Sequence, residues 1–178
     1  DEYHYFTSPD LFFGYVEKYA REKSRLWVIS HNQHFDFNVL GGFRQMARRG
    51  WILRKFVIDS DLFILHYVKA SKRVVFVDTL NYIKAKLEDM GKQIGLEKLK
   101  INFENASDEE LSEYCKRDVE ILSEWFLRLI RWWKENDLGK FGETVSQLAY
   151  NCFRHKFMTN KLLVHQNKDA LELEKESY

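Results

Sequence analysis

Apolar positions recur at helical spacing in some segments of the chain and in short unbroken runs in others. Residues 9–22 show helical spacing, with Pro9 near the start, where proline is well tolerated. The run RLWVIS at 25–30 is rich in β-branched and aromatic residues, which is typical of a buried strand. Helical spacing returns over residues 37–49, and Gly50 is placed to end it. This part of the chain therefore predicts a helix, a strand and a second helix.

Residues 51–77 change to strand-like patterns. The runs WILRKFVI, LFILHYVK and RVVFVD are separated by two short polar breaks, at residues 59–61 and 71–72. We expect the first two runs to pair as a hairpin.

Helical spacing dominates the rest of the chain. Residues 79–94 form one predicted helix, with Gly95 as its cap, and residues 108–136 form a longer one. Ser107 and Glu110 have the spacing of a capping box at the start of the longer helix. The order of helices and strands indicates an α/β fold.

A break with two glycines at residues 136–142 is the best candidate for a domain boundary. We expect one domain over 1–138 and a connecting segment over 139–178. Within that segment, 143–158 has a helical pattern, 161–165 is extended or a loop, and 168–178 is an acidic, helical tail.

The long predicted helix carries one misplaced charge. Beyond its first turn, Asp118 is the only charged residue within a broad apolar face, and Tyr114 lies one helical turn before it. A carboxylate turned toward a core is costly unless an ion pair or a metal compensates for it. The apolar face is predicted to be core, tryptophans included, and consists of Leu111, Cys115, Val119, Leu122, Trp125, Phe126, Leu129, Ile130 and Trp133.

Composition limits the possible classes of protein. The 178 residues are enough for one domain, and 45% hydrophobic with 31% charged residues is ordinary for a globular protein. The net charge is only +1, so any contact with nucleic acid must come from local patches. No apolar run is long enough to cross a bilayer, which predicts no membrane partner.

The two cysteines, Cys115 and Cys152, lack the spacing of a metal site or a disulfide. We expect both to be buried thiols of a reducing compartment. The first residues, DEYHYFTSPD, are unlike a signal peptide. The chain is therefore expected to be cytoplasmic or organellar, or encoded by a virus or plasmid, and not secreted.

A second group of candidate residues, Asn32-x-x-Phe35-Asp36, follows the strand at 25–30. Ligands of α/β folds bind at the carboxyl ends of strands, where Asp36 and Asp118 can meet. Oxygen ligands suit Mg²⁺ or Mn²⁺, and two such ions about 3.5–4 Å apart can hold both the attacking and the leaving oxygen of a phosphodiester.

The other candidate residues suit supporting roles at such a centre. The phenol of Tyr114 is neutral near pH 7 and would orient a metal-bound water. Phe35 offers a ring on which a terminal base can stack, and Asn32 can hydrogen-bond a base or a sugar.

Each candidate also has a structural interpretation. Asp36 could cap the helix at 37–49, Asp118 could be half-buried beside an arginine, and Tyr114 could be a boundary aromatic. Asp78, in VDTLN, is a helix cap rather than a third ligand in our interpretation.

Two histidines and a basic stretch also lie near these motifs. His31 and His34 lack zinc spacing, so we assign neither to a metal. A basic stretch is either a solvated face or a track for phosphates, and consists of Arg44, Arg48, Arg49, Arg54 and Lys55.

The segments HNQHFD, VDTLN and YCKRDVEIL together resemble the 3′–5′ exonuclease domain of family B DNA polymerases, of the DEDD type with a tyrosine in its third motif. The resemblance covers most of residues 10–135. It implies a ribonuclease H-like fold with a mixed sheet flanked by helices. It also implies that Asp36 and Asp118 bind Mg²⁺ or Mn²⁺, two ions in the intact site. Tyr114 would then position the water.

The segment ETVSQLAYNCFRHKF and the tail LELEKESY resemble the connection from exonuclease to polymerase in protein-primed, organellar and viral enzymes. The family's first motif, D-x-E on an opening strand, has no counterpart in this sequence. We therefore expect a fragment whose first strands are missing and whose metal site is half-built.

The resulting interpretation is the proofreading exonuclease portion of a DNA-directed DNA polymerase, weakly active or inactive by itself. Its implied partners are the 3′ end of single-stranded DNA, a covalently linked polymerase domain and a terminal protein primer. Two alternatives stay open: a stand-alone exonuclease of the same type acting on DNA or RNA, and a degenerate domain that binds DNA or serves as a scaffold.

Overall fold

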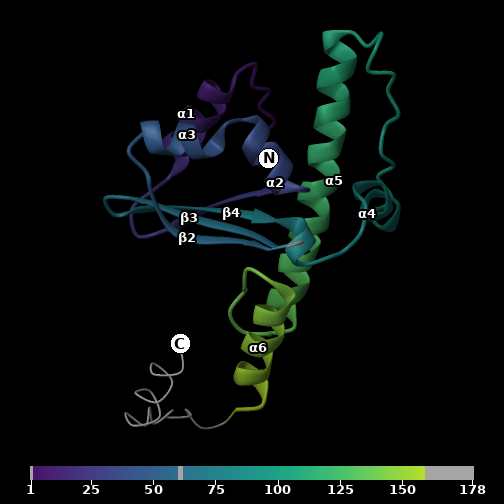
Figure 1. The fold of residues 1–178 in the computed structure, drawn as a ribbon. Coiled ribbons are helices and arrows are strands. Elements are labelled where there is room, and N and C mark those ends of the chain that lie inside the picture. Colours follow the sequence, from purple (N-terminus) through teal and green to yellow (C-terminus); the bar gives the residue numbers. More distant parts are fainter. Residues whose placement is uncertain (1, 60–61, 159–178) are drawn as a thin grey trace.

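A mixed four-stranded sheet organises the chain (Figure 1). The computed structural model describes residues 2–59 and 62–158. The strands are ordered β1-β4-β3-β2, with β1 and β4 parallel and the other neighbours antiparallel. Their bounds are β1 Arg25–Ser30, β2 Ile52–Asp59, β3 Leu62–Lys69 and β4 Lys72–Asp78. The prediction of an α/β fold is confirmed, as is the hairpin of β2 and β3.

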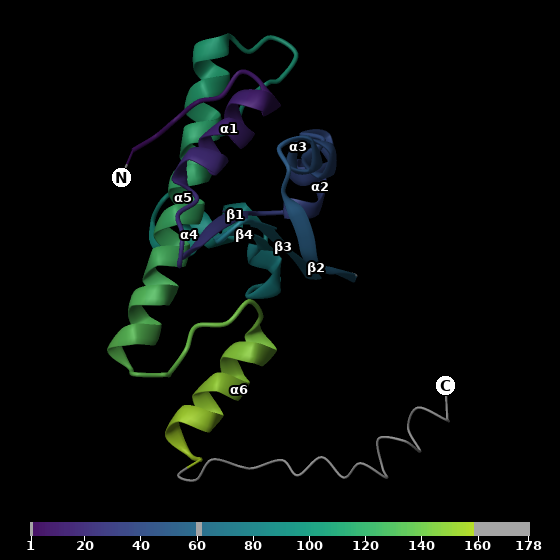
Figure 2. The same ribbon diagram turned by 90° about the vertical axis from the view of Figure 1, so that its left-hand side faces the viewer.

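Helices flank this sheet on one face and along one side (Figures 1 and 2). Three short helices, α1, α2 and α3, cover one face. The long helix α5 runs beside the sheet with α4 packed against it, and α6 follows below. The bounds are α1 Pro9–Tyr19, α2 Gln33–Val39, α3 Gly42–Arg48, α4 Leu87–Ile94, α5 Asp108–Glu135 and α6 Val145–Lys156.

The core lies between the sheet and the first three helices. Alternate residues of a strand point to one face, so Leu65, Val74 and Phe76 turn together toward these helices and are fully buried. The ring of Phe37 lies 4.9 Å from that of Phe76 and 6.1 Å from that of Phe13. This cluster fixes α2, and therefore the residues that precede it, over the sheet.

The helix predicted over 37–49 is instead two helices. The first starts at Gln33, and Gly41, at φ 62°, separates it from the second. A Cβ on Gly42 would lie 2.5 Å from the ring of Phe37, so a glycine is required where the two helices pack. Similarly, the helix predicted over 79–94 is a 3₁₀ turn at Thr79–Asn81 followed by α4.

The caps of α4 and α5 match the sequence. Gly95 ends α4 at φ 78°, and Ser107 with Glu110 forms the predicted capping box at the start of α5. The segments predicted at 161–165 and 168–178 lie outside the described residues.

The predicted apolar face of α5 is only partly buried. Val119 is 51% exposed and Cys115 is exposed, whereas Ile121, which was not assigned to that face, is fully buried. The prediction of a buried Cys115 thiol is therefore wrong, and Cys152 is half-buried. The start of α5 projects past the sheet, so none of the four described strands covers this part of its apolar surface (Figure 1). Trp133 is buried as expected, but Trp132 is 54% exposed.

The segment after α5 is anchored to the sheet. The ring of Phe141 lies 5.7 Å from that of Tyr82, 5.8 Å from that of Phe126 and 6.0 Å from that of Trp133. The side chain of Glu143 is 6% exposed, and its carboxylate contacts Lys55 at 2.8 Å and His66 at 2.9 Å. Although burial opposes ionisation, His66 and Lys55 lower the pKa of Glu143 to about 2. The domain boundary expected after residue 138 stays a prediction.

Within residues 2–59 and 62–158, no helix is long and apolar enough to cross a membrane.

Candidate functional site

The carboxyl ends of β1 and β4 lie side by side, because the two strands are parallel and Ser30 pairs with Asp78. Asp78 is 2% exposed, and its carboxylate accepts hydrogen bonds from three backbone N–H groups. These are the N–H groups of Asn32 at 3.1 Å, Gln33 at 2.6 Å and Leu80 at 2.9 Å. The predicted capping role of Asp78 is confirmed, and the same carboxylate also holds the loop after β1.

The motif Asn32-x-x-Phe35-Asp36 forms the start of α2. Asn32 precedes the helix at φ 66°, a left-handed conformation that asparagine tolerates better than most residues. The side chains of Asn32 and Phe35 are exposed, the latter at 62%, while Asp36 is half-buried in the first turn. Asp36 therefore does not cap a helix at 37–49, because α2 has already begun at Gln33. The exposed amide and ring are free to contact a ligand.

The half-buried position of Asp36 disfavours the ionised form of its carboxylate. Burial raises its pKa and the negative charge of Asp78 adds to this, whereas the side chain of Ser30 and the charge of His31 oppose it. A nearby cation would relieve this strain, since opposite charge favours the ionised form.

Asp118 belongs to a cluster with Tyr114 and Lys98. The Nζ atom of Lys98 lies 3.1 Å from Oδ2 of Asp118 and 5.1 Å from the ring centre of Tyr114. Although burial opposes it, interactions with Tyr114 and Asp118 raise the pKa of Lys98. The other oxygen of Asp118, Oδ1, is buried and has no hydrogen-bond partner in the described part of the chain. A buried carboxylate oxygen normally has a hydrogen-bond partner or a metal, so Oδ1 of Asp118 is available to bind a ligand.

Lys98 is the functional candidate that the sequence did not reveal. An arginine partner was considered for Asp118, but the actual partner is a lysine from the loop between α4 and α5. The segment EKLKINFEN has no periodicity that would single out Lys98 from Lys100. Only the folding of this loop back onto α5 identifies it.

His31 connects the two motifs. Its Nδ1 atom lies 2.8 Å from the hydroxyl of Thr79, which fixes the ring beside the end of β4. Burial lowers the pKa of His31, and the charge of Lys98 lowers it further. The charges of Asp78, Asp36 and Asp118 raise it. The charges of Asp36 in one motif and Asp118 in the other therefore both raise the pKa of His31, against the effect of burial.

The donor set at this site suits a hard divalent cation only in part. Asp36 and Asp118 offer carboxylate oxygens, one of them unpartnered, which is the ligand type that Mg²⁺ and Mn²⁺ prefer. Among the residues that the structure describes, no group of three or more His, Cys, Asp or Glu side chains is arranged to hold a metal ion. The assignment of Asp36 and Asp118 as metal ligands therefore stays a prediction.

The basic stretch expected as a solvated face or phosphate track is mostly engaged in ion pairs. Arg48 and Arg49 both contact Asp10, and Lys55 contacts Glu143. Arg44 and Arg54 remain exposed.

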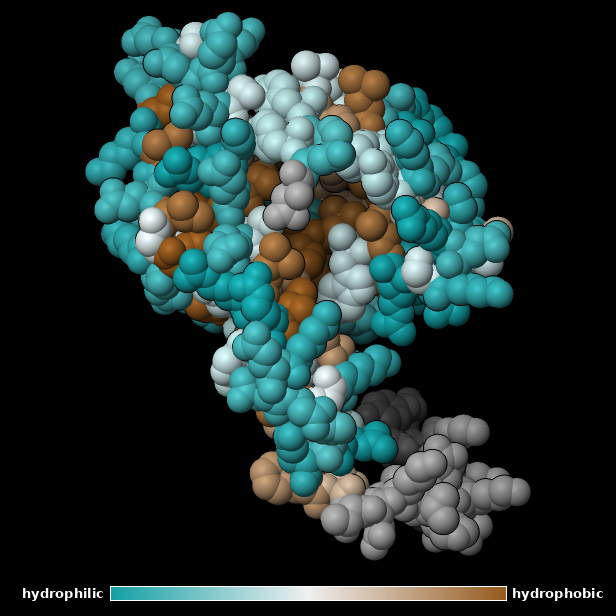
Figure 3. All heavy atoms as spheres, turned by 180° about the vertical axis from the view of Figure 1, so that it is seen from behind, coloured by the Kyte–Doolittle hydropathy of each residue, from teal (hydrophilic) through white to brown (hydrophobic). Residues whose placement is uncertain are grey.

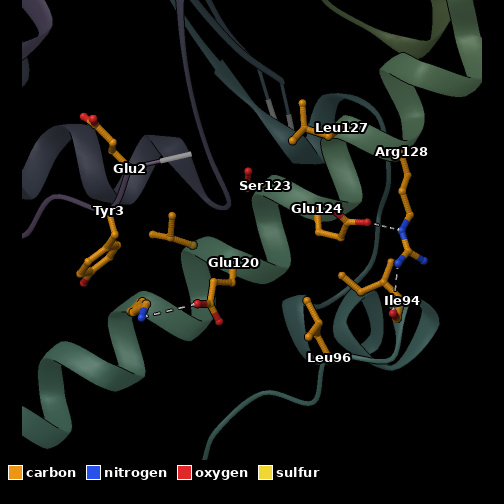
Figure 4. Close-up of a pocket in the computed structure, with 11 residues that line it drawn as sticks. Glu2, Tyr3, Ile94, Leu96, Glu120, Ser123, Glu124, Leu127 and Arg128 are labelled. Carbon is orange, nitrogen blue, oxygen red and sulfur yellow. Dashed lines mark hydrogen bonds and ion pairs between the residues drawn. The ribbon is translucent and has the colours of Figure 1, made fainter.

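A separate cavity of about 570 Å³ lies between α4, α5 and the N-terminal segment (Figure 4). Tyr3 and Leu127 line it, and Glu124 lies 2.7 Å from Arg128 at its side. Neither Asp36 nor Asp118 lines this cavity, so it is distinct from the candidate site.

Comparison of the chain with protein-family models, curated proteins and solved structures found no match.

Proposed function

We propose that this chain is the 3′–5′ exonuclease portion of a DNA-directed DNA polymerase of family B, with a ribonuclease H-like fold. The observation that carries the proposal is the unpartnered, buried Oδ1 of Asp118, considered together with the half-buried carboxylate of Asp36, whose pKa burial raises. A divalent cation would satisfy both carboxylates at once.

The topology supports this proposal. The two candidate carboxylates come from the first turn of α2, just after β1, and from a long helix beside the sheet. Ligands of open α/β sheets bind in such a place, at the carboxyl ends of parallel strands. A mixed sheet with helices on its flanks is also what a ribonuclease H-like fold requires.

In this proposal Asp36 and Asp118 hold the metal, which supplies charge stabilisation at the scissile phosphate and a more acidic bound water. The phenol of Tyr114 donates a hydrogen bond that orients the attacking water. Phe35, exposed at the start of α2, stacks on a terminal base, and Asn32 hydrogen-bonds it or its sugar. Lys98 holds Asp118 in place through its ion pair.

The resemblance to family B exonucleases also calls for a D-x-E motif, which this sequence lacks. Strand β1 lies at the edge of the sheet, so its outer side can accept a further strand. Figure 3 shows apolar side chains gathered in a hollow on this side of the molecule. We include in the proposal that a strand carrying the remaining carboxylates pairs there.

The test combines Mn²⁺ binding with digestion of 5′-labelled single-stranded DNA. Mn²⁺ binding is expected to weaken at least ~tenfold in Asp36→Asn and Asp118→Asn, because each removes a ligand. Tyr114→Phe should keep Mn²⁺ binding and lose the weak release of 3′-terminal nucleotides. Glu113→Gln, an exposed change on the same helix, is the matched control.

Three outcomes would count against the proposal. If Asp36→Asn and Asp118→Asn leave Mn²⁺ binding unchanged, these residues are not metal ligands and the proposed metal site is rejected. DNA binding without any metal-dependent cleavage, even when the D-x-E segment is supplied, would favour the non-catalytic alternative. Preference for an RNA oligonucleotide over DNA in the same assay would point to the stand-alone exonuclease.

A further inference from the structure

The sheet has a second face, opposite the core, that is only partly covered. The register places Arg25 beside Arg73, Val68 beside Arg73, and His66 beside Val75. Cross-strand partners point to the same side of a sheet. This side is opposite to that of Val74 and Phe76, which pack against α1, α2 and α3. Phe141 and Glu143 cover one part of it, beside Trp27 and His66.

The remaining part is a basic hollow of about 680 Å³ at the amino ends of β1 and β4. Its floor includes Val68 and Val75, and no acidic residue lines it. The basic side chains around it come from all four strands and the turn before β1, and are Lys23, Arg25, Arg54, His66 and Arg73.

Most of this positive charge is uncompensated. Within residues 2–59 and 62–158, no acidic side chain pairs with Lys23, Arg54 or Arg73. Glu143 contacts His66 closely but reaches Arg25 only at 3.8 Å. Glu143 is also already neutralised by Lys55 at 2.8 Å. Three arginines around one hollow repel one another unless an anion joins them.

We infer that this hollow, which we call the basic sheet pocket, binds the phosphodiester backbone of a single-stranded nucleic acid. The choice of nucleic acid rests on the proposed exonuclease function. Arginine forks match phosphate oxygens in a bidentate way, and the three arginines supply several such donors. The molecule's net charge of +1 leaves no general attraction for DNA, so a local patch must supply it.

The pocket lies apart from the candidate metal site. The paired strands run from Arg25 and Arg73 at the pocket to Ser30 and Asp78 at the candidate site. Five residue steps along a strand span roughly 16 Å. A strand that leaves the candidate site therefore has to travel only a few nucleotides to reach the basic sheet pocket. The pocket would hold the strand upstream of the 3′ end while that end is cleaved.

The test measures binding of a 5′-labelled oligothymidine by fluorescence anisotropy at several salt concentrations in EDTA. EDTA chelates divalent cations and prevents metal-dependent cleavage, so the anisotropy reports DNA binding alone. Arg54→Glu with Arg73→Glu should weaken binding at least ~tenfold. The slope of log Kd against log salt should fall by about 1.4, since each lost phosphate contact on a single strand contributes about 0.7.

The control is Lys86→Glu with Arg131→Glu, which changes the net charge equally at exposed positions on α4's cap and on α5. It should change Kd less than ~threefold. Arg54→Gln with Arg73→Gln is the milder pair in case charge reversal affects folding, and it should also lower the slope by about 1.4, because the same two phosphate contacts are lost. Glu113→Gln, an exposed change on α5, should bind as tightly as the wild type, and the presence of EDTA keeps this inference separate from the exonuclease proposal.

Two results would overturn the inference. One is equal weakening by the pocket pair and the control pair. The other concerns residues 168–178, which carry four carboxylates. If pocket-dependent DNA binding arises only in a chain ending at residue 158, the pocket's anion is the chain's own tail. Loss of cleavage alone, with pocket-dependent binding intact, would reject only the exonuclease proposal.

Discussion

Replacing Glu143 by glutamine is expected to lower the free energy of unfolding by about 2–3 kcal/mol at pH 7. The carboxylate is 6% exposed on its side chain and forms ion pairs with Lys55 and His66. An amide of the same shape keeps the packing but removes the charge. Lys55 is 42% exposed, so water will partly solvate it in the variant, which limits the loss.

The same number follows from the pKa of Glu143. Its value falls from 4.5 to about 2, which corresponds to about 3 kcal/mol at 1.36 kcal/mol per unit. Because the pKa is lower in the folded state, this stabilisation is fully present above pH 4.5, the unfolded value. It is lost as the pH falls toward 2, where the folded carboxyl also takes up a proton.

The assay is urea unfolding followed by tryptophan fluorescence at several pH values between 7 and 2.5. The difference in unfolding free energy between the wild type and Glu143→Gln should be about 2–3 kcal/mol at pH 7 and shrink steadily below pH 4.5. Glu113→Gln, an exposed change on α5, should stay within about 0.5 kcal/mol of the wild type at every pH.

A constant difference across this pH range would refute the reasoning, because the loss would then come from shape and not from charge. Equal stability of the wild type and Glu143→Gln at pH 7 would show that the ion pairs only offset the desolvation of the carboxylate.

Two further substitutions test the local structure. Asp78→Ala leaves three backbone N–H groups without their acceptor. It should lower the free energy of unfolding by about 3 kcal/mol or more in the same urea assay. A decrease below about 1 kcal/mol would show that water replaces the carboxylate as acceptor. Ile121→Ala should lower the free energy of unfolding by about 2–5 kcal/mol, because this side chain is fully buried. Val119→Ala should lower it by under about 0.5 kcal/mol, because Val119 is 51% exposed. Equal decreases in the two variants would contradict the placement of α5.

The sequence by itself determined the local structure. The strand over Arg25–Ser30, the hairpin of β2 and β3 and the capping box of Ser107 and Glu110 all lie where their patterns predict. These features depend on neighbouring residues, whose conformational preferences and side-chain hydrogen bonds act over a few positions. The role of Asp78 as a cap was readable for the same reason.

The sequence was less informative where two interpretations share one pattern. The pattern over 37–49 fits one helix as well as two, and the left-handed Gly41 and the packing of Gly42 on Phe37 divide it. For the candidate site, the sequence motifs identify Asp36, Tyr114 and Asp118, but their chemistry stays a proposal. Asp36 is not a cap of the 37–49 helix because α2 starts at Gln33, which places Asp36 in its first turn.

The tertiary structure alone decided which side of α5 is buried and which residue partners Asp118. Helical periodicity defines an apolar stripe but not how the helix is turned against the sheet, so Ile121 is buried while Cys115 and Val119 face outward. The pairing of Lys98 with Asp118 and the ring of cations around the basic sheet pocket join residues far apart in the chain. Such contacts depend on the closure of loops and the register of strands, which no local pattern encodes.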